Sequence, residues 1–461
     1  MLVLKRIGKF LLVPMALLML LTGISPVTKS KQAELEKKLA EAVEQDFVPV
    51  FRFAITSDVH VKANDRTNAD RLAKLFQTAY RYSEGHATYK SLDAVLLAGD
   101  NCESGADAEY AELNRVVKEN MREGTQFVPI MGNHEFSVGG HDGYERNMET
   151  PLDVHVVVKG FHIIGLSPDP KDTWQTLKQA NWMYGELKKA EADDPDKPIF
   201  TMQHGHIWRT VYVSRSWHTQ AFTSLHSVYS QFPQVVNFSG HSHGPINNPI
   251  SIWQNSYTQV GTGTLNYFEM ERDITKKTIP EGANRAAQYT IVEVDAQNRV
   301  RLLPYNILTD DFMKTPSTTD DPDKQLIRQI DKPSDPSTYV YTSARKKTAT
   351  KPWFDKDAAV AVTNVGADSV TIVFDSAEDN ECVYGYSVKV AEAARPKKAV
   401  AKMGVYAEYY FEPMPASQSC TIEGLEAGKD YVVSVTPMNV WLQKGEAIST
   451  AFSTPAEAAA R

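Results

Sequence analysis

The sequence predicts an α/β domain followed by a small all-β sandwich. From Val48 onwards, short apolar runs typical of buried strands alternate with amphipathic segments typical of helices. Residues 309–351 are rich in Asp, Pro, Ser, Thr and Lys and show little apolar periodicity, which is typical of a linker. After Trp353 the chain contains short strand-like segments separated by turn residues, which is the pattern of a small β-sandwich.

Length and composition agree with two folded domains. A chain of 461 residues is too long for one hydrophobic core, and 42% hydrophobic and 23% charged residues are ordinary for globular protein. The net charge of −8 argues against nucleic acid as the main partner, because phosphate binding needs a basic surface. Three cysteines are too few for a disulfide scaffold, although Cys382 and Cys420 could pair in an exported protein.

The first 28 residues are typical of an export segment. Lys5, Arg6 and Lys9 precede an uncharged run over residues 10–28, whose apolar centre reads FLLVPMALLMLL. A cleaved signal peptide is favoured over a retained membrane anchor, because Pro14 and similar helix breakers interrupt the run. Both interpretations predict an extracytoplasmic protein, secreted or membrane-anchored, that touches the membrane only through this segment if it is not cleaved.

The next two segments are a helical spacer over residues 29–47 and the α/β domain over residues 48–308. The domain begins with a βαβαβ pattern. Its strands are expected at FRFAIT, LDAVLLAG and FVPIM, and its helices over residues 68–84 and 106–121. Further strands, a helix over residues 173–190 and a hairpin over residues 288–303 complete the domain.

The linker over residues 309–351 has room for one short helix near residues 324–330, and the sandwich occupies residues 352–456. Its strands are expected over residues 369–374, 384–390, 420–422, 431–436 and 448–452. The segment LEAGKDYVVSV, residues 425–435, resembles the tyrosine corner of fibronectin type III domains, an immunoglobulin-like sandwich. The sandwich carries no catalytic cluster, so we expect it to position the protein on a surface, glycan or protein partner.

Five polar motifs stand out in the α/β domain, and four of them directly follow apolar runs. They are TSDVH (56–60), GDNCE (99–103), MGNHE (131–135), QHGH (203–206) and SGHSH (239–243). Because ligands bind at the carboxyl ends of strands in open α/β sheets, several strand ends could present these motifs to one point.

The motifs supply carboxylate, imidazole and amide donors, at Asp58, His60, Asp100, Asn133, His204, His241 and His243. A carboxylate such as Asp100 can bridge two cations and offset their repulsion. This mixed oxygen and nitrogen set suits Mn, Fe or Zn better than Mg or Ca, which prefer oxygen ligands. The sequence therefore predicts a site for two metal ions.

The same motifs resemble the calcineurin-like metallophosphoesterase family, over about residues 51–303. The family pattern is D-x-H, GD-x-x-D/E, GNH-D/E, a later H and GH-x-H, and each element is present. The resemblance implies an αββα sandwich of two sheets with helices outside. It implies that one metal is held by Asp58, His60, Asp100 and His243, and the second by Asp100, Asn133, His204 and His241. His134 matches the family's general acid, and Glu103 matches the carboxylate that orients it.

The activity implied by this resemblance is metal-dependent hydrolysis of small phosphoesters, with phosphodiesters favoured. Two ions about 3.5–4 Å apart would activate a water, and His134 would protonate the leaving group. A phosphomonoesterase or nucleotidase, or a non-catalytic surface binding protein with a structural metal site, are the alternatives. Purple acid phosphatases carry D-x-G and a Tyr where this chain has His60 and Glu103, so a tyrosinate-ligated ferric site is not expected.

Residues 207–233 are rich in aromatics and are the expected source of substrate contacts. Trp208 and Trp217 could hold the organic part of the substrate, and Arg209 or Arg215 its phosphate. The same aromatics could instead pack as a lid over the sheet. His206 is a further candidate for this region, more typical of a pocket wall than of a metal ligand.

Overall fold

The computed structural model of this chain describes residues 47–169, 174–219 and 222–456. The expected export segment and all but one residue of the helical spacer lie outside these residues. The chain from Pro49 onwards forms one compact unit. Within the described part, no helix combines the length and apolar character needed to cross a membrane.

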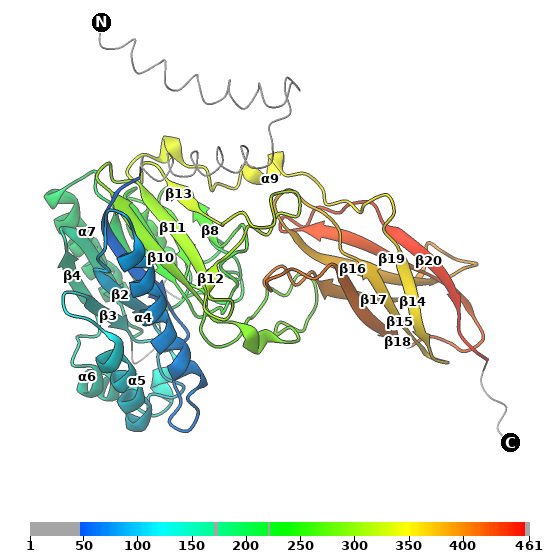
Figure 1. The fold of residues 1–461 in the computed structure, drawn as a ribbon, viewed down its shortest axis with the longest axis horizontal. Coiled ribbons are helices and arrows are strands. Elements are labelled where there is room, and N and C mark those ends of the chain that lie inside the picture. The colour runs from blue at the N-terminus through cyan, green and yellow to red at the C-terminus, as the bar shows by residue number, and fades with distance from the viewer. Residues whose placement is uncertain (1–46, 170–173, 220–221, 457–461) are drawn as a thin grey trace, which may run out of the picture. The chain divides into compact units, whose positions relative to one another are not determined.

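The first sheet of the α/β domain has the strand order β12-β11-β10-β1-β2-β3, with β13 also paired to β11 (Figure 1). Its strands are β1 (Pro49–Thr56), β2 (Ala94–Ala98), β3 (Gln126–Ile130), β10 (Gln288–Asp295), β11 (Val300–Asn306), β12 (Asp311–Phe312) and β13 (Arg328–Ile330). Strands β1, β2 and β3 are parallel, so their carboxyl ends lie at the same edge.

The second sheet has the order β4-β5-β6-β7-β9-β8. Its strands are β4 (Val154–Val158), β5 (Phe161–Leu166), β6 (Ile199–Gln203), β7 (Val235–Ser239), β8 (Ile252–Gln254) and β9 (Thr258–Gly261). Strands β5, β6, β7 and β9 are parallel, which again places their carboxyl ends together.

The two sheets share one hydrophobic core, and helices cover their outer faces. Phe51 of the first sheet stacks on Phe161 of the second, with ring centroids 4.8 Å apart. The helices α4 (Thr67–Gly85), α5 (Asp107–Asn120) and α6 (Gly140–Met148) pack on the first sheet, and α7 (Leu177–Asp193) and α8 (Phe222–Tyr229) on the second. The αββα architecture implied by the sequence is thus confirmed.

The C-terminal domain is a β-sandwich, as predicted. One sheet contains β14 (Val360–Val365), β15 (Ser369–Asp375) and β18 (Ser417–Glu423), and the other contains β17 (Ala399–Tyr406), β16 (Val383–Glu392), β19 (Asp430–Asn439) and β20 (Ile448–Ser453). The Tyr431 hydroxyl accepts a 2.9 Å hydrogen bond from the Glu426 backbone N–H, the contact that a tyrosine corner makes. All three cysteines are free thiols, so Cys382 and Cys420 are not paired.

The predicted linker contains strands, and the short helix expected near residues 324–330 is wrong. Strands β12 and β13 both pair with β11 and extend the first sheet. Arg328 and Ile330 are buried at this sheet, and the Arg328 guanidinium donates to the Asn248 carbonyl at 2.7 Å. This alternating burial needs an extended backbone. The helix of this region is instead α9 (Arg345–Thr348).

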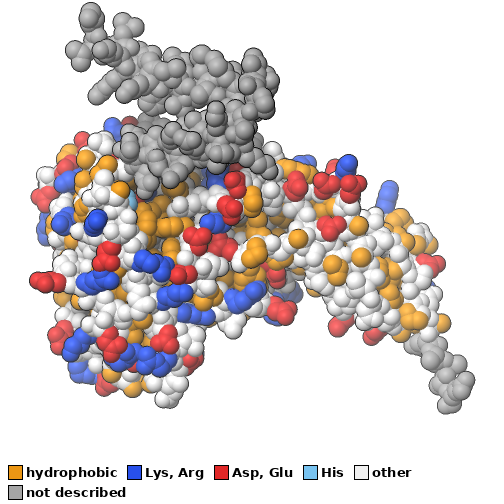
Figure 2. Space-filling view, in the orientation of Figure 1, with side chains coloured by type: hydrophobic (Ala, Val, Ile, Leu, Met, Phe, Trp, Pro, Cys, Tyr) orange, Lys and Arg blue, Asp and Glu red, His pale blue; other side chains and the backbone are white. Residues whose placement is uncertain are grey.

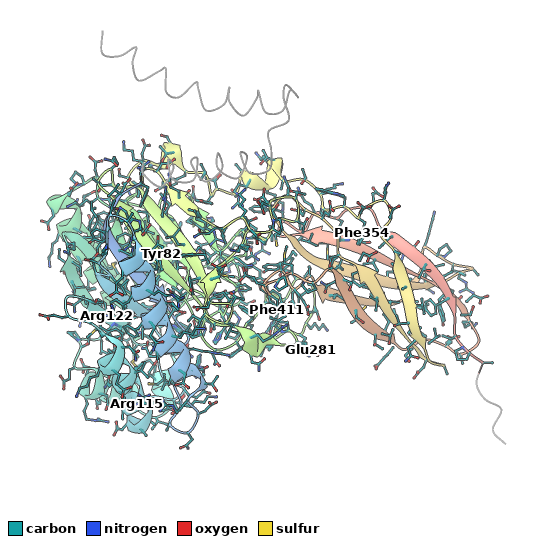
Figure 3. All side chains as sticks on the ribbon, in the orientation of Figure 1. Tyr82, Arg115, Arg122, Glu281, Phe354 and Phe411 are labelled. Carbon is teal, nitrogen blue, oxygen red and sulfur yellow. The ribbon has the colours of Figure 1, made fainter. Side chains whose placement is uncertain are left out.

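A cluster of aromatic side chains joins the sandwich to the α/β domain. Tyr384 of β16 donates to the Asp273 carboxylate at 2.6 Å, and its oxygen lies 2.9 Å from the Tyr212 hydroxyl. Phe411, labelled in Figure 3 at the boundary of the two domains, packs under the Arg285 guanidinium at 3.6 Å. The sandwich is therefore bonded to the segments around Tyr212 and Asp273 rather than tethered by a free linker.

Charged side chains are interspersed over the visible surface. On the face shown in Figure 2, the Lys and Arg side chains of the described residues alternate with Asp and Glu over the α/β domain. This mixed pattern fits the modest net charge of −8.

Candidate metal centre

The five polar motifs lie just beyond the carboxyl ends of five strands. Asp58 follows β1, Asp100 follows β2, and Asn133 and His134 follow β3 of the first sheet. His204 follows β6, and the GHSH segment follows β7 of the second sheet. Ion-pair contacts across the two sheets, such as the 3.0 Å contact of His204 Nε2 with Asp100 Oδ2, show that these ends converge.

The backbone at these positions is strained. Five candidate ligands have positive φ angles, between 50° and 68°, namely Asp58, His60, Asp100, His241 and His243. Residues other than glycine rarely adopt this region, at a cost of about 1–3 kcal/mol each. The surrounding loops therefore hold the ligand side chains in directions that an unconstrained chain would not favour.

Two motif glycines permit the close approach of these loops. A Cβ atom on Gly132 would overlap the backbone nitrogen and carboxylate of Asp100. A Cβ atom on Gly240 would overlap the Ser57 hydroxyl and the Asp58 carboxylate. Their place in the GNH and GH-x-H motifs thus has a steric cause.

Asp58, His60 and His243 form the first group of possible ligands, with one donor atom of each within 4.8 Å of the others. Asp58 Oδ2 accepts from the Ser57 hydroxyl and from the His241 backbone N–H. Its other oxygen, Oδ1, lies 3.3 Å from His243 Nε2. His243 Nδ1 donates to the Tyr267 carbonyl at 3.0 Å, so Nε2 carries the lone pair that a metal would use.

Asp100, His204 and His241 form a second group within the same distance limit of 4.8 Å. His204 Nδ1 donates to the Ala98 carbonyl at 2.8 Å, which leaves Nε2 as the ligand atom. Asp100 Oδ2 lies 3.0 Å from His204 Nε2 and 3.8 Å from His60 Nε2, a ligand of the first group. Asp100 thus stands between the two groups, where a bridging carboxylate would be needed.

The chemistry of the donors fits a metal centre. Several of their atoms are buried and have no hydrogen-bond partner among the described residues: Asp58 Oδ1, His60 Nε2, Asn133 Oδ1 and His204 Nε2. An unsatisfied buried polar group costs about 1–3 kcal/mol. Coordination of cations would satisfy all of them at once, and these residues are the ones that the motifs predicted as ligands.

Burial and neighbouring charges set the ionisation of the site. Burial raises the pKa of Asp58 to about 6, opposed by the His204 imidazole. Burial acts in the same direction on Asp100, but the adjacent His204 outweighs it and holds the pKa of this carboxyl well below its usual range. Burial lowers the pKa values of His241 and His243. Burial also lowers the pKa of His204, but the adjacent Asp100 carboxylate outweighs it and raises this pKa to about 9. Without a metal the site therefore combines carboxylates with neutral His241 and His243 and a protonated His204 at neutral pH, and a metal that binds His204 would replace its proton.

His134 lies against both groups. Its backbone N–H donates to Asp100 Oδ1 at 2.9 Å, and its ring contacts the His60 ring edge-on at 4.4 Å. His134 Nδ1 donates to the main-chain carbonyl of Glu103 at 2.9 Å. The Glu103 carboxylate lies instead 3.3 Å from His60 Nδ1, so residue 103 orients His134 through its backbone rather than through the expected carboxylate.

Glu135 is a buried residue beside the candidate site that the sequence interpretation did not single out. Its carboxylate is fully buried and accepts from the backbone N–H groups of Asn101, Cys102 and Gly132, at 2.6, 3.0 and 2.8 Å. It therefore ties the loop after β2 to the loop after β3. Its place in the MGNHE motif, next to His134, was the signal that could have identified it.

The predicted substrate residues are found in two places. Trp217 packs edge-on against His241 at 5.0 Å, and its indole N–H is buried with no partner among the described residues. Trp174, which the sequence did not suggest, contacts the same imidazole at 4.8 Å. The Arg209 guanidinium lies 4.2 Å from the Trp208 ring. Arg209 and Arg215 line a cavity that contains none of the candidate metal ligands.

His206 supports the loop of the GH-x-H motif. The side chain is 1% exposed, and its two ring nitrogens lie 2.6 Å from the hydroxyls of Ser239 and Ser242. These bonds occupy both nitrogens, and burial lowers the pKa of the imidazole to about 3. The structure thus places His206 under the ligand loop, with neither ring nitrogen open to a substrate.

Comparison with known proteins connects this geometry to a family. Residues 51–245 match the sequence model of the calcineurin-like phosphoesterases. No curated protein matches the chain significantly. A purple acid phosphatase, PPD1, from yellow lupin (Lupinus luteus) seeds is 13% identical at a TM-score of 0.41, and the alignment covers 57% of this chain and 52% of that one.

Two small solved structures are also similar to part of the chain. A myokine structure is 18% identical at a TM-score of 0.17, over 23% of this chain and 98% of its own. A computationally redesigned β-sandwich protein is 16% identical at a TM-score of 0.18, over 24% of this chain and 98% of its own.

Proposed function

Because residues 51–245 match the sequence model of the calcineurin-like phosphoesterases, we propose that this protein hydrolyses phosphoester bonds, preferably diesters, with two metal ions held between its sheets. The observation that carries the proposal is the position of Asp100. One of its oxygens faces ligand atoms of both groups, and the unpaired buried donors surround it. This arrangement is expected of a bridging carboxylate and is otherwise costly to bury.

Each ion would have its own ligands around the shared carboxylate. Asp58, His60, Asp100 and His243 would hold one, and Asp100, Asn133, His204 and His241 the other. The mixed donors favour Mn, Fe or Zn. When bound, such a pair neutralises phosphate charge and lowers the pKa of water.

His134 would supply the proton for the leaving group. Its Nδ1 is held as a donor by the Glu103 carbonyl, so Nε2 is the atom that can deliver a proton to the departing alkoxide. The His134 backbone is itself fixed by Asp100 at 2.9 Å, which ties the acid to the proposed metal bridge.

The tryptophans beside His241 support the preference for diesters. Trp174 and Trp217 offer apolar ring faces, and the unpaired Trp217 N–H offers one donor to a substrate oxygen. A diester carries an organic group on both sides of the phosphorus, so apolar surface close to the metal ligands favours it over a monoester.

Hydrolysis of bis-nitrophenyl phosphate by the full chain loaded with Mn tests this function. We expect turnover that a chelator abolishes, with a higher kcat/KM than for nitrophenyl phosphate. Faster turnover of the monoester would favour a phosphomonoesterase or nucleotidase of the same fold. Absence of turnover on both esters, with metal bound, would favour a binding protein whose metal only stabilises the fold.

We further propose that the protein works outside the cytoplasm and that its sandwich is of the fibronectin type III kind. The basic and apolar pattern of residues 1–28 supports export, and the Tyr431–Glu426 contact supports the domain type. Mass spectrometry of the N-terminus of protein recovered from the producing cells would identify a cleaved signal peptide.

A further inference from the structure

A cavity of about 470 Å³ lies where the α/β domain, the linker and the sandwich meet. Its walls come from residues 209–215 and 250–253 of the α/β domain, 341–346 of the linker, and 440–442 of the sandwich. Its volume is within the range of small-molecule sites, which often lie at domain boundaries. We propose that this cavity binds a small ring compound that carries a phosphate, such as a sugar phosphate or a nucleoside monophosphate.

A buried hydroxyl on the cavity wall has no partner. Ser214 lines the cavity and is 1% exposed, and its Oγ makes no hydrogen bond with the described residues. The Ser214 backbone N–H is satisfied by the Val211 carbonyl at 3.2 Å, so the turn does not need the side chain. A hydroxyl left in this state is available to donate to a ligand oxygen.

The charged groups on the walls give the cavity a positive character. The cavity is lined by four cationic side chains and by two carboxylates, Glu271 and Asp273. The formal excess is therefore two positive charges. Both carboxylates are already bonded by hydroxyls, Glu271 by Ser216 and Asp273 by Tyr384. Among the cations, Arg345 is paired with Glu381, which lies outside the lining.

The remaining cations are available to an anion. Arg209, Arg215 and Lys346 form no ion pair with a carboxylate of the described residues, and all three line the cavity and are exposed. A guanidinium presents parallel N–H donors that match the oxygens of a phosphate. These side chains thus supply the charge, and Ser214 supplies the uncharged donor.

Aromatic rings complete the lining. Trp253, Tyr341 and Trp441 come from β8, the linker and the sandwich. The polar ends of two of these rings are occupied, because the Trp441 N–H donates to Glu381 at 2.7 Å and the Tyr341 hydroxyl accepts from the Gln329 N–H at 3.0 Å. The Arg345 guanidinium lies 5.9 Å from the Tyr341 ring centroid and 5.7 Å from that of Trp441. The rings and this cation together form a wall of mixed aromatic and cationic character, which is why the ligand should contain a ring as well as a phosphate.

Calorimetric titration of the full chain in chelator tests this site independently of the phosphoesterase function, because no metal or turnover is involved. The probes are AMP, ribose 5-phosphate and adenosine. We expect saturable binding of at least one of the two phosphates and none of adenosine. Binding of AMP alone would identify a nucleotide site, and binding of ribose 5-phosphate with equal affinity would identify a sugar phosphate site.

Two variants locate the binding. Arg215→Gln should weaken it at least about tenfold, since it removes a charged donor. Ser214→Ala should weaken it about threefold or more without lowering the melting temperature, because the hydroxyl has no structural partner. Arg395→Gln is the matched control, since Arg395 is exposed on the sandwich and does not line the cavity.

Two results would overturn the proposal. One is the absence of saturable binding of both phosphates by the wild type. The other is an affinity for the phosphate probes that is the same in Arg215→Gln, Ser214→Ala and the control Arg395→Gln. The proposal would also be contradicted if Asp100→Asn weakened binding as much as Arg215→Gln does, because the ligand would then occupy the metal centre.

Discussion

At the scale of single residues, the two oxygens of each central carboxylate have different tasks. Asp58 Oδ2 and Asp100 Oδ1 accept backbone N–H groups of the neighbouring ligand loops, at 3.0 and 2.9 Å. Asp58 Oδ1 and Asp100 Oδ2 face imidazole nitrogens instead. The same carboxylates therefore both fix the loops and offer atoms to the proposed metals.

The proposed acid role of His134 can be tested separately from the proposed metal site. His134→Ala should keep the bound metals and lose about 10²- to 10⁴-fold in kcat on esters with poor leaving groups. A nitrophenyl ester, whose leaving group needs little protonation, should be affected far less. An equal loss on both kinds of ester would rule out the acid role of His134.

Glu135 is expected to matter through the loops that it joins. Glu135→Gln keeps one acceptor oxygen for the Asn101 and Cys102 N–H groups but places an amide N–H₂ against the Gly132 N–H, so we expect a loss of about 1–3 kcal/mol in the free energy of unfolding and weaker binding of Mn. Urea unfolding and metal titration measure these effects. Glu145→Gln is the control, because Glu145 is exposed on α6. Unchanged stability in Glu135→Gln would show that the contact of the second carboxylate oxygen with the Gly132 N–H is dispensable.

At the scale of elements, the strands that carry the motifs could be predicted from the sequence, whereas exposed edge strands and individual backbone contacts could not. Long apolar runs such as Leu92–Ala98 identify buried strands, and the motif spacing then identifies the ligands. Strands β14 and β17 were missed because they lie at sheet edges and many of their side chains are exposed. The contact of His134 with the Glu103 backbone could not be predicted either, because every residue has a backbone carbonyl and residue type does not indicate which one accepts a hydrogen bond.

A chain of hydrogen bonds at β4, β5 and α7 should make the second sheet sensitive to acid. Glu186 contacts His155 Nδ1 at 2.6 Å, and His155 Nε2 lies 2.8 Å from His162 Nδ1. His162 also contacts the Asp193 carboxylate at 3.0 Å. The two imidazoles share one proton between their facing nitrogens, so protonation of both would break this contact.

The sign of the pH effect follows from the shifted pKa values. Burial and the neighbouring His155 lower the pKa of His162 below 6.5, so stability is lost as the pH falls below that value. Burial opposes ionisation of Glu186, but Lys189 and His155 outweigh it and lower its pKa, which adds a further loss below pH 4.5. Urea midpoints measured between pH 7.5 and 5 should fall for the wild type and change less for His162→Gln. Equal slopes would contradict this account.

At the scale of the whole molecule, the sandwich is bonded to the segments that support the candidate metal ligands. Tyr212 lies five residues before Trp217, which packs on His241. Tyr267, whose carbonyl accepts from His243, precedes Phe268 and Met270 in the aromatic cluster that includes Tyr384 and Tyr410. The sequence predicted a sandwich joined to the α/β domain by a linker. It did not predict the contacts between the two domains, because contacts between residues far apart in the sequence leave no local pattern.

Tyr384→Phe tests this coupling. It leaves Asp273 and Tyr212 without their shared partner, so the free energy of unfolding should fall by about 1–3 kcal/mol. Tyr184→Phe is the control, since Tyr184 is 40% exposed on α7. Equal urea midpoints for the two variants would mean that the hydroxyl contacts between the domains contribute nothing measurable.

Asp100 is proposed to join two metal ions between the sheets, and the metal content of the chain measures this. Elemental analysis of the full chain, after loading with Mn and removal of free ions, should give two ions per chain for the wild type. Asp100→Asn should give fewer than one, while Asp142→Asn, an exposed change on α6, should retain two. Two tightly bound ions in Asp100→Asn, or none in the wild type, would rule out a metal pair bridged by Asp100.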